Sequence, residues 1–449
     1  MRKRNGKSRR RRVGRVSFYP HHGSWWVYYR DAGSAVRKPV APDEATAERI
    51  AAQINAQLSS GAPSLFSFSP ATAVELQQDF VDYHEHVVRS SLATVNRYRT
   101  ATRYLVDFMS RDDRRRAAHE IDADEFVKYL RTLRISPNGH AHSLRRPLRD
   151  KGVRFILETC RAMYGFAARK RRMPPYAANP FAGLGGKRFR IEDAKRVFVF
   201  DERLETAFLA ACDDWSFPIH FVLAKTGVRP GELVHAMIDD LDLDTGWWCV
   251  CNKPELGWRV KTRRERPVPL VHEVVQVLRR VIGDRQAGPV FVRPDAARAL
   301  LHNANEAALS RVVERRVLAA ESALSQQICR TETARIHRAI WRDAGGVRVD
   351  AIRVSFMRTA QRAGLEAISC PKSWRHTFAT LLQDANVDPL IRQLTLGHSP
   401  TAGPESALGM TALYTHTRPQ TQKREIERAL SLWPKSLELG RRWISGDQT

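Results

Sequence analysis

Residues 373–382 read SWRHTFATLL, an apolar run with helical spacing that carries an arginine and a histidine near its start. The apolar side chains recur three and four residues apart, which predicts one buried face of a helix. They are Trp374, Phe378, Leu381 and Leu382. Pro371 and Ser373 mark the helix start, so three polar side chains gather at its N-terminal end: Lys372, Arg375 and His376.

A second arginine is predicted at another helix start. Residues 215–227, WSFPIHFVLAKTG, read as a helix that stops at Gly227, and VRPGELV follows. Pro230 suits the first turn of a new helix and forces Arg229 into an extended conformation. Arg229 therefore lies at a helix N-terminus, where free amides attract an anion. Glu232, one turn on, can hold its guanidinium.

A lysine is predicted at the tip of a hairpin. GWWCVCN, residues 246–252, reads as one strand, and GWRVKTRRERPVPL, residues 257–270, supplies the second half of a small sheet. Lys261 opens the charged turn KTRRER between them. Hairpin tips are commonly charged for solubility alone, so this lysine is informative only together with the other motifs.

Two further stretches complete the pattern. DPLIRQLTLGHS, residues 388–399, predicts a helix that ends at Gly397 with His398 just beyond. GMTALYTHT, residues 409–417, presents Tyr414 beside a histidine.

These side chains together have the chemistry of phosphodiester cleavage, although each alone is commonplace. Two arginines can grip the non-bridging oxygens of a phosphate. A lysine can protonate a departing alkoxide, and a tyrosine can attack phosphorus and store the bond energy as a phosphodiester.

The order of these stretches resembles the tyrosine recombinases, the phage-integrase family. TGVRPGEL resembles the first-arginine box of that family, and KTRRERPVPL its hairpin lysine box. KSWRHTFATLL resembles its His-x-x-Arg-His-Thr box, LGHS its third box and ALYTH its nucleophile box. The resemblance covers roughly residues 198–420 strongly, and the helical segment before it is similar to the family's core-binding domain.

The resemblance implies a role for each matching residue. Arg229 and Arg375 would clamp the scissile phosphate, and Lys261 would be the general acid for the 5′-oxygen. His398 would hydrogen-bond the phosphate, and Tyr414 would form the 3′-phosphotyrosyl bond. No metal or other cofactor is implied.

Glu232 and His376 would be supporting residues, and three features depart from the family pattern. Lys372 stands where the family usually has histidine, and we interpret it as a further phosphate contact or a weak substitute. Residues 400–410, PTAGPESALGM, make a longer connection to the nucleophile, which could let the tyrosine helix move or serve a neighbour. Residues 296–348 are a helical insertion that could touch DNA, pack on its own domain or mediate assembly.

Composition agrees with a partner that is a polyanion. The chain has 449 residues, of which 74 are Lys or Arg and 48 are Asp or Glu, for a formal net charge of +26. Such an excess is typical of nucleic-acid binding. No apolar stretch reaches the roughly 18 residues of a membrane span, and the basic N-terminus lacks a signal-peptide core. We therefore expect a cytoplasmic, nucleoid-associated protein with no membrane partner. The six cysteines match no zinc spacing and are expected to be reduced and mostly in the core.

We predict a mainly α fold with small β-sheets in three domains. Residues 1–60 would be a basic arm and a small strand-plus-helix module, either an arm-type DNA-binding module or an accessory extension. Residues 71–182 would form a helical core-binding domain. Residues 198–449 would form the catalytic domain, with helices around a small antiparallel sheet and the insertion at about 296–348.

The resemblance predicts a site-specific DNA recombinase that integrates or excises a mobile element. Its partners would be double-stranded DNA attachment sites, three further copies in a homo-tetramer, and accessory DNA-bending or directionality proteins. Two alternatives remain, a type IB topoisomerase-like enzyme and a catalytically decayed DNA-binding protein. The tail QKREIERALSLWPKSLELGRRW, residues 422–443, places Ile426, Leu430 and Trp433 on one face. It is expected to dock on a neighbouring subunit, so that deletion after Thr417 would reduce cooperativity more than single-site cleavage.

Overall fold

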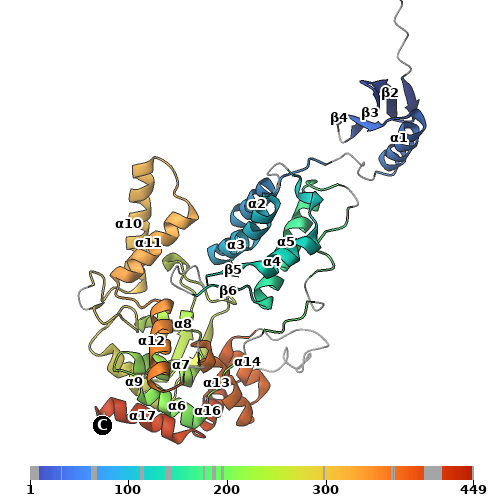
Figure 1. Ribbon diagram of the computed structural model, residues 1–449. Helices are drawn as coiled ribbons and strands as arrows, with labels where there is room; N and C mark the ends of the chain where they lie inside the picture. The colour runs from blue at the N-terminus through green and yellow to red at the C-terminus, as the bar shows by residue number, and fades with distance from the viewer. Residues whose placement is uncertain are drawn as a thin grey trace, which may run out of the picture. The chain divides into compact units, whose positions relative to one another are not determined.

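The computed structural model describes residues 10–31, 33–61, 68–111, 116–136, 144–174, 177–184, 189–193, 197–296, 299–365, 368, 370–398 and 417–446. The chain divides into two compact units, Met1–Lys195 and Arg196–Thr449. Helices dominate both, with small antiparallel sheets (Figure 1), so the predicted fold class is confirmed.

The first unit begins with a four-stranded antiparallel sheet covered by one helix. The strands pair in sequence order and the helix follows them: β1 (Arg11–Val13), β2 (Val16–His21), β3 (Ser24–Asp31), β4 (Ser34–Ala41) and α1 (Glu44–Ser59). Phe18, Val27 and Tyr29 of the sheet and Ile54 of the helix are buried together. The sequence predicted a small strand-plus-helix module in this part of the chain.

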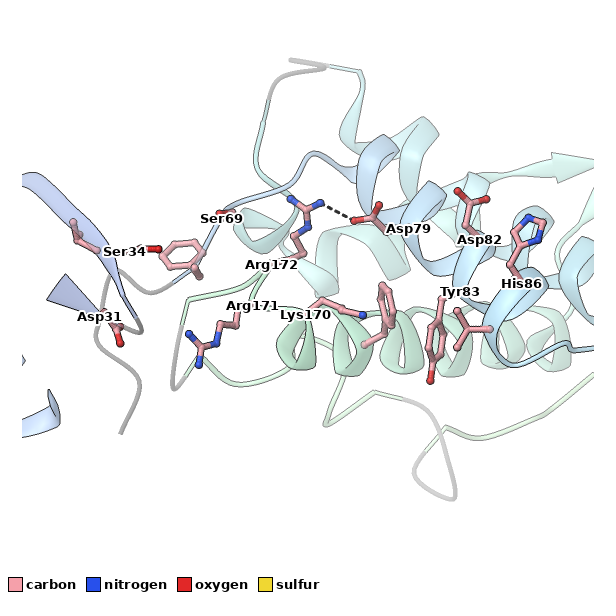
Figure 2. Close-up of a pocket in the computed structure, with 14 residues that line it drawn as sticks. Asp31, Ser34, Ser69, Asp79, Asp82, Tyr83, His86, Lys170, Arg171 and Arg172 are labelled. Atoms are coloured by element: carbon pink, nitrogen blue, oxygen red, sulfur yellow. Dashed lines mark ion pairs between the residues drawn. The ribbon is translucent and has the colours of Figure 1, made fainter. Parts of the chain in front are cut away.

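The rest of the first unit is a group of helices with one two-stranded ribbon. Its elements are α2 (Ala73–Asp82), η1 (Tyr83–Val87), α3 (Leu92–Met109), η2 (Ala118–Glu120), α4 (Ala123–Thr132), β5 (Arg134–Ile135), β6 (Arg146–Pro147) and α5 (Asp150–Arg169). Asp122 caps α4 by accepting hydrogen bonds from two backbone N–H groups. Arg172, just after α5, pairs with Asp79 of α2 at 3.0 Å (Figure 2). Phe181 is fully buried here, so this core extends beyond α5.

In the second unit, helices surround a three-stranded antiparallel sheet. Its elements are α6 (Glu202–Ala210), α7 (Ser216–Thr226), α8 (Pro230–Val234), η5 (Ile238–Asp240), β7 (Leu241–Asp242), β8 (Trp247–Val250), η6 (Pro254–Leu256), β9 (Arg266–Pro269), α9 (His272–Ile282), α10 (Glu306–Leu324), α11 (Arg330–Asp343), α12 (Val349–Arg362), α13 (Lys372–Asp384), α14 (Pro389–Leu396), α16 (Pro419–Leu430) and α17 (Pro434–Ser445). The last strand starts only at Arg266, so Trp258 and Val260 precede the sheet that they were predicted to join.

Helices α7 and α13 pack together at the centre of this unit. The four apolar residues that predicted α13 are all buried. Trp374 stacks on Phe200, with ring centroids 4.2 Å apart. Gly227 ends α7 with φ of +62°, and a Cβ there would lie 2.3 Å from the Phe378 ring. Glycine is therefore required for α13 to approach the turn between α7 and α8.

His220 of α7 is fully buried in this core and should make stability depend on pH. The Trp374 indole N–H donates to its Nδ1 at 3.4 Å, so Nε2 carries the proton and faces Ser355 Oγ at 3.3 Å. Burial lowers the pKa of His220 to about 3. Between that value and about 6.5, the pKa of an exposed histidine, the unfolded chain binds a proton that the folded chain does not. The stabilisation is thus complete above about pH 6.5 and is lost as the pH falls.

Going from pH 7.5 to pH 5 should therefore remove about 2 kcal/mol from the free energy of unfolding through His220 alone. Urea unfolding of the wild-type chain and of His220→Gln at both pH values measures this. The variant should lose about 2 kcal/mol less than the wild type over this interval. Equal losses in the two proteins would contradict the assignment.

The insertion is a helical hairpin whose base packs on its own domain. Helices α10 and α11 lie side by side and project from the second unit (Figure 1). Leu309 and Val313 of α10 and Trp341 of α11 form a buried cluster with Met237 and Leu256 of the domain body. Of the three possibilities left open by the sequence, packing on the domain is therefore observed.

The C-terminal tail also packs on its own domain, which corrects the expectation that it docks on a neighbouring subunit. Ile426 and Leu430 of α16 are 0% and 1% exposed within the main core of the second unit. Leu437 and Trp443 of α17 join the same core. The amphipathic pattern identified the buried face correctly, but the surface that covers this face belongs to the same chain.

The cysteines are unpaired but not mostly in the core as predicted. Only Cys160 is buried, and Cys249, Cys329 and Cys370 are exposed. None of the helices in the described ranges is long and apolar enough to cross a membrane.

Candidate active site

Arg229 is held at the start of α8 by a buried carboxylate. Its backbone is extended, with φ of −75° and ψ of 147°, and Pro230 begins the helix as predicted. Its Nη1 lies 2.7 Å from Glu232 Oε1, and its backbone N–H donates to Glu232 Oε2 at 2.9 Å. Glu232 is thus the guanidinium partner that the sequence predicted.

A third arginine, Arg266, shares this carboxylate and was missed by the sequence analysis. Its guanidinium makes a two-pronged contact with Glu232, Nη2 to Oε2 at 2.7 Å and Nη1 to Oε1 at 3.2 Å. Its Nε donates to the carbonyl of Thr395 at 3.0 Å. A Cβ on Gly397 would lie 2.8 Å from Arg266 Cδ, so glycine lets the end of α14 close over this side chain. Arg266 therefore joins β9, α8 and α14.

Glu232 stays ionised despite its burial. Burial alone would raise the pKa of Glu232, but hydrogen bonds and charge from Arg266, with hydrogen bonds from Arg229, outweigh it and hold the pKa below its usual value. A buried carboxylate shared by two guanidiniums leaves one net positive charge. That charge is accessible to a ligand at Arg229, which is the more exposed of the two arginines.

Arg375 connects the other motifs to this cluster. From the first turns of α13 its Nη1 donates to the Gly227 carbonyl at 2.8 Å, and its Nη2 donates to the Leu396 carbonyl. Burial, together with the positive charge of Arg229, lowers the pKa of Arg375 to about 9, so it remains a cation at pH 7. An anion between the two arginines would relieve their repulsion, and such a pair is therefore suited to bind a phosphate.

His398 lies beside Arg375 and is neutral. Arg375 Nη2 donates to His398 Nε2 at 3.0 Å, so the proton of the ring is on Nδ1. Burial lowers the pKa of His398, and the guanidiniums of Arg375, Arg229 and Arg266 lower it further. A neutral imidazole that carries an N–H is a hydrogen-bond donor to an anion without being an acid at pH 7.

The remaining predicted residues are less closely connected. Lys261 lies exposed in the turn after Val260, and Lys372 and His376 are exposed on the first two turns of α13. None of these three side chains makes a hydrogen bond or ion pair with the residues that the structure describes, so the expected support from His376 is not observed as a contact. Tyr414, the predicted nucleophile, lies outside the described residues.

The site thus gathers three guanidiniums and one neutral imidazole from four separate parts of the chain. Arg229 of α8, Arg266 of β9, Arg375 of α13 and His398 after α14 are linked through Glu232 and two backbone carbonyls. Such a site can hold a phosphodiester by its non-bridging oxygens.

Residues 205–421 match the family model described as the phage integrase family. This domain belongs to the phage integrase family. The matched range contains all the residues predicted for the site, from Arg229 to Tyr414.

Individual relatives of this phage integrase domain match more distantly. Tyrosine recombinase XerC of Corynebacterium efficiens is 40% identical over 105 residues, which are 23% of this chain and 31% of the relative. The match thus spans about a third of that relative's length. The Tn1549 transposon integrase in complex with a circular intermediate DNA is 16% identical, with 80% of this chain and 99% of that one covered and a TM-score of 0.45. The lambda integrase tetramer bound to a Holliday junction is 14% identical, with 85% and 95% covered and a TM-score of 0.47.

Replacing Arg266 with alanine should destabilise the phage integrase domain. The change leaves the buried Glu232 carboxylate, whose side chain is 1% exposed, paired with Arg229 alone. Breaking a buried ion pair costs about 3 kcal/mol or more. The free energy of unfolding in urea measures this loss. Arg264→Ala, an exposed neighbour in the same hairpin, is the control and should stay within about 0.5 kcal/mol of wild type. Equal effects of the two changes would argue that the Glu232 contact is not stabilising.

Proposed function

We propose that this protein is a site-specific DNA recombinase, an integrase that cuts and rejoins DNA through a 3′-phosphotyrosyl intermediate and so integrates or excises a mobile element. The convergence of Arg229, Arg375 and His398 in the domain that matches the phage integrase family carries this proposal. In the proposed reaction, the two guanidiniums bind the non-bridging oxygens of one DNA phosphate. Their positive charge has its largest effect in the transition state, where negative charge develops on the oxygens of the five-coordinate phosphorus.

Tyr414 supplies the nucleophile in this proposal. Its phenol loses its proton to water, the oxygen attacks phosphorus and the P–O5′ bond breaks. Lys261 transfers a proton from its ammonium group to the departing 5′-oxygen. Lys372 adds a further positive charge at the start of α13, and His398 donates to a phosphate oxygen. The covalent bond conserves the energy of the diester, so rejoining requires no nucleotide.

The proposed partners follow from this chemistry. The substrate is a double-stranded attachment site, and the net charge of +26 supports binding to its phosphates. Exchange between two duplexes cuts four strands, and each cut consumes one tyrosine, so we propose a homo-tetramer on paired sites. Accessory DNA-bending or directionality proteins would set the direction of the reaction. The reaction would take place in the cytoplasm at the nucleoid.

Covalent capture tests the function. Sequencing the junctions of the mobile element that carries the gene gives the attachment core, from which nicked suicide substrates are made. Incubation should trap a protein–DNA complex that survives denaturation, and peptide mapping should place the DNA on Tyr414. The absence of any such complex on the true core, with binding intact, would favour a decayed DNA-binding protein. Relaxation of supercoils without exchange of partners would favour a topoisomerase.

A further inference from the structure

The hairpin that carries Lys261 lacks the regular pairing that would fix its tip. β9 begins only at Arg266, five residues after the lysine. Between β8 and β9, Asn252 accepts the Val260 N–H on Oδ1 at 2.9 Å and donates from Nδ2 to the Arg263 carbonyl at 3.3 Å. These bonds shape the turn, but they do not attach it to the rest of the domain. Val260, the residue before the lysine, is 1% exposed in the main core of the second unit and anchors the start of the turn.

Trp258, three residues before the lysine, makes a further contact with the domain. Its indole stacks on the imidazole of His235, with ring centroids 4.0 Å apart and planes within 6°. Its outer edge lies against Gly231 of α8, where a Cβ would be 2.9 Å from Trp258 Cη2. The hairpin therefore rests on the short helix whose first residue is preceded by Arg229.

His235 is oriented by α8 and shared with the insertion. Its Nδ1–H donates to the Gly231 carbonyl at 2.8 Å, and burial lowers the pKa of His235 to about 4, so the ring is neutral at pH 7. The same ring stacks on Trp341 of α11, with centroids 5.1 Å apart and planes within 26°. The three rings come from residues that are far apart in the chain. The hairpin, the arginine helix and the insertion meet in this aromatic stack of Trp258, His235 and Trp341.

A second contact joins the insertion to the hairpin. His337, one turn before Trp341, lies so close to Gly257 that a Cβ there would be 2.4 Å from its Nδ1, and φ of Gly257 is +73°. Leu256 of the hairpin is 7% exposed among the insertion residues Leu309 and Val313. Lys253, at the foot of this loop, is fixed by a buried ion pair of 2.7 Å to Asp240.

We propose that the helical part of the insertion, α10 and α11, is a positioning element for the lysine of the proposed reaction: Trp341 acts through His235 and Trp258 to hold the hairpin so that the Lys261 ammonium reaches the 5′-oxygen. This inference rests on the proposed function. It assigns the base of the insertion a role in proton transfer and makes His235, Trp258 and Trp341 positioning residues.

The leaving group separates this role from mere structural support. When the 5′-bridging oxygen is replaced by sulfur, the P–S bond breaks to give a thiolate, which needs no proton because a thiol has a pKa of about 8.5. A defect that acts through Lys261 is then relieved, whereas a general loss of structure is not. Single-turnover cleavage of nicked substrates with 5′-oxygen or 5′-sulfur is therefore measured for each variant of the full chain.

On the oxygen substrate, Lys261→Ala should slow cleavage by about 100-fold or more, as expected for loss of a general acid. Trp341→Ala should slow it by about 10-fold, because a poorly positioned Lys261 loses only part of its contribution as a general acid. On the sulfur substrate both variants should return to within about threefold of wild type, and Trp341→Phe, which keeps a stacking ring, should be close to wild type on both. Leu318→Ala, at a position of α10 that is 62% exposed, is the matched control within the insertion and should change neither rate.

Trp258→Ala provides a second route if Trp341→Ala does not fold, because Trp258 is only half-buried and the insertion core stays intact. It should show the same loss on oxygen and recovery on sulfur. Equal loss on both substrates, or no loss on oxygen, would overturn the inference. Failure of the wild type and Lys261→Ala to cleave either substrate would instead overturn the proposed function.

Discussion

A protein in which Tyr414 is replaced by phenylalanine should bind its attachment core as tightly as the wild type and form no covalent complex with it. The change removes one oxygen atom, which is the nucleophile of the proposed reaction. Affinity for DNA depends chiefly on contacts between cationic side chains and phosphates, and none of these is altered. Binding by gel shift and capture on a nicked suicide substrate, measured with the same preparation, should therefore give opposite outcomes.

Tyr83→Phe is the control for this prediction, because it makes the same chemical change in the first unit, in the π-helical turn after α2. It should retain both binding and capture. A covalent complex of Tyr414→Phe that forms at the wild-type rate would show that another residue attacks the phosphate and that ALYTH is not the nucleophile motif. Loss of binding together with capture would mean that the change acts through folding.

The helices of the candidate site were predictable because each follows a strong local pattern. The period of α13 identified its buried face, and Gly227 and Pro230 marked where α7 ends and α8 begins. Glu232 was predicted because one helical turn separates it from Arg229. The structure brings the predicted Arg229, Arg375 and His398 into one network.

Arg266 was missed because the run KTRRER reads as an exposed charged tip. A signal was nevertheless present. In the strand that follows, Arg266 and Val268 are buried whereas Pro267 between them is exposed, which is the alternation of a half-buried strand. A predicted strand that began one residue earlier, at Arg266, would have placed this side chain on the buried face together with Val268. A buried arginine needs a carboxylate, and Glu232 was already expected in the site.

The aromatic stack could not be predicted in this way. Trp258, His235 and Trp341 come from a hairpin, a helix end and an insertion, and no local period relates residues so far apart. The tail shows the same limit, since its pattern predicted an apolar face but not the surface that covers it. Local patterns specify elements and faces, whereas the pairing of faces depends on how the whole chain packs.

Deleting the chain after Thr417 should unfold the second unit, in contrast to the selective loss of cooperativity expected from the sequence. The deletion removes Ile426, Leu430, Leu437 and Trp443 from the core. Each large apolar side chain lost from a core costs about 2–5 kcal/mol, and a domain has only about 5–15 kcal/mol of stability in total. Single-site cleavage should therefore disappear together with cooperativity.

A buried polar network strengthens this expectation. Glu205 of α6 accepts from Lys225 of α7 at 2.5 Å and from Ser436 of α17 at 2.5 Å, and all three side chains are at most 1% exposed. Gln422 of α16 also donates to Thr395 Oγ1 at 2.9 Å, and the carbonyl of the same Thr395 accepts from Arg266. Loss of the tail would expose the Glu205–Lys225 pair and remove a support of the site, so the damage extends beyond lost apolar contacts.

Point variants separate the two roles of the tail without a deletion. Ile426→Ala, at a fully buried position, should lower the free energy of unfolding in urea by about 3 kcal/mol. Leu432→Ala, 52% exposed in the same tail, should change it by less than about 0.5 kcal/mol. A truncated protein that unfolds at the wild-type urea midpoint and still cleaves single sites, but fails to assemble on paired sites, would restore the neighbour-docking interpretation. The packing of Ile426 and Leu430 against the domain's own core argues for the opposite result, because a surface buried in its own domain is not available to a second subunit.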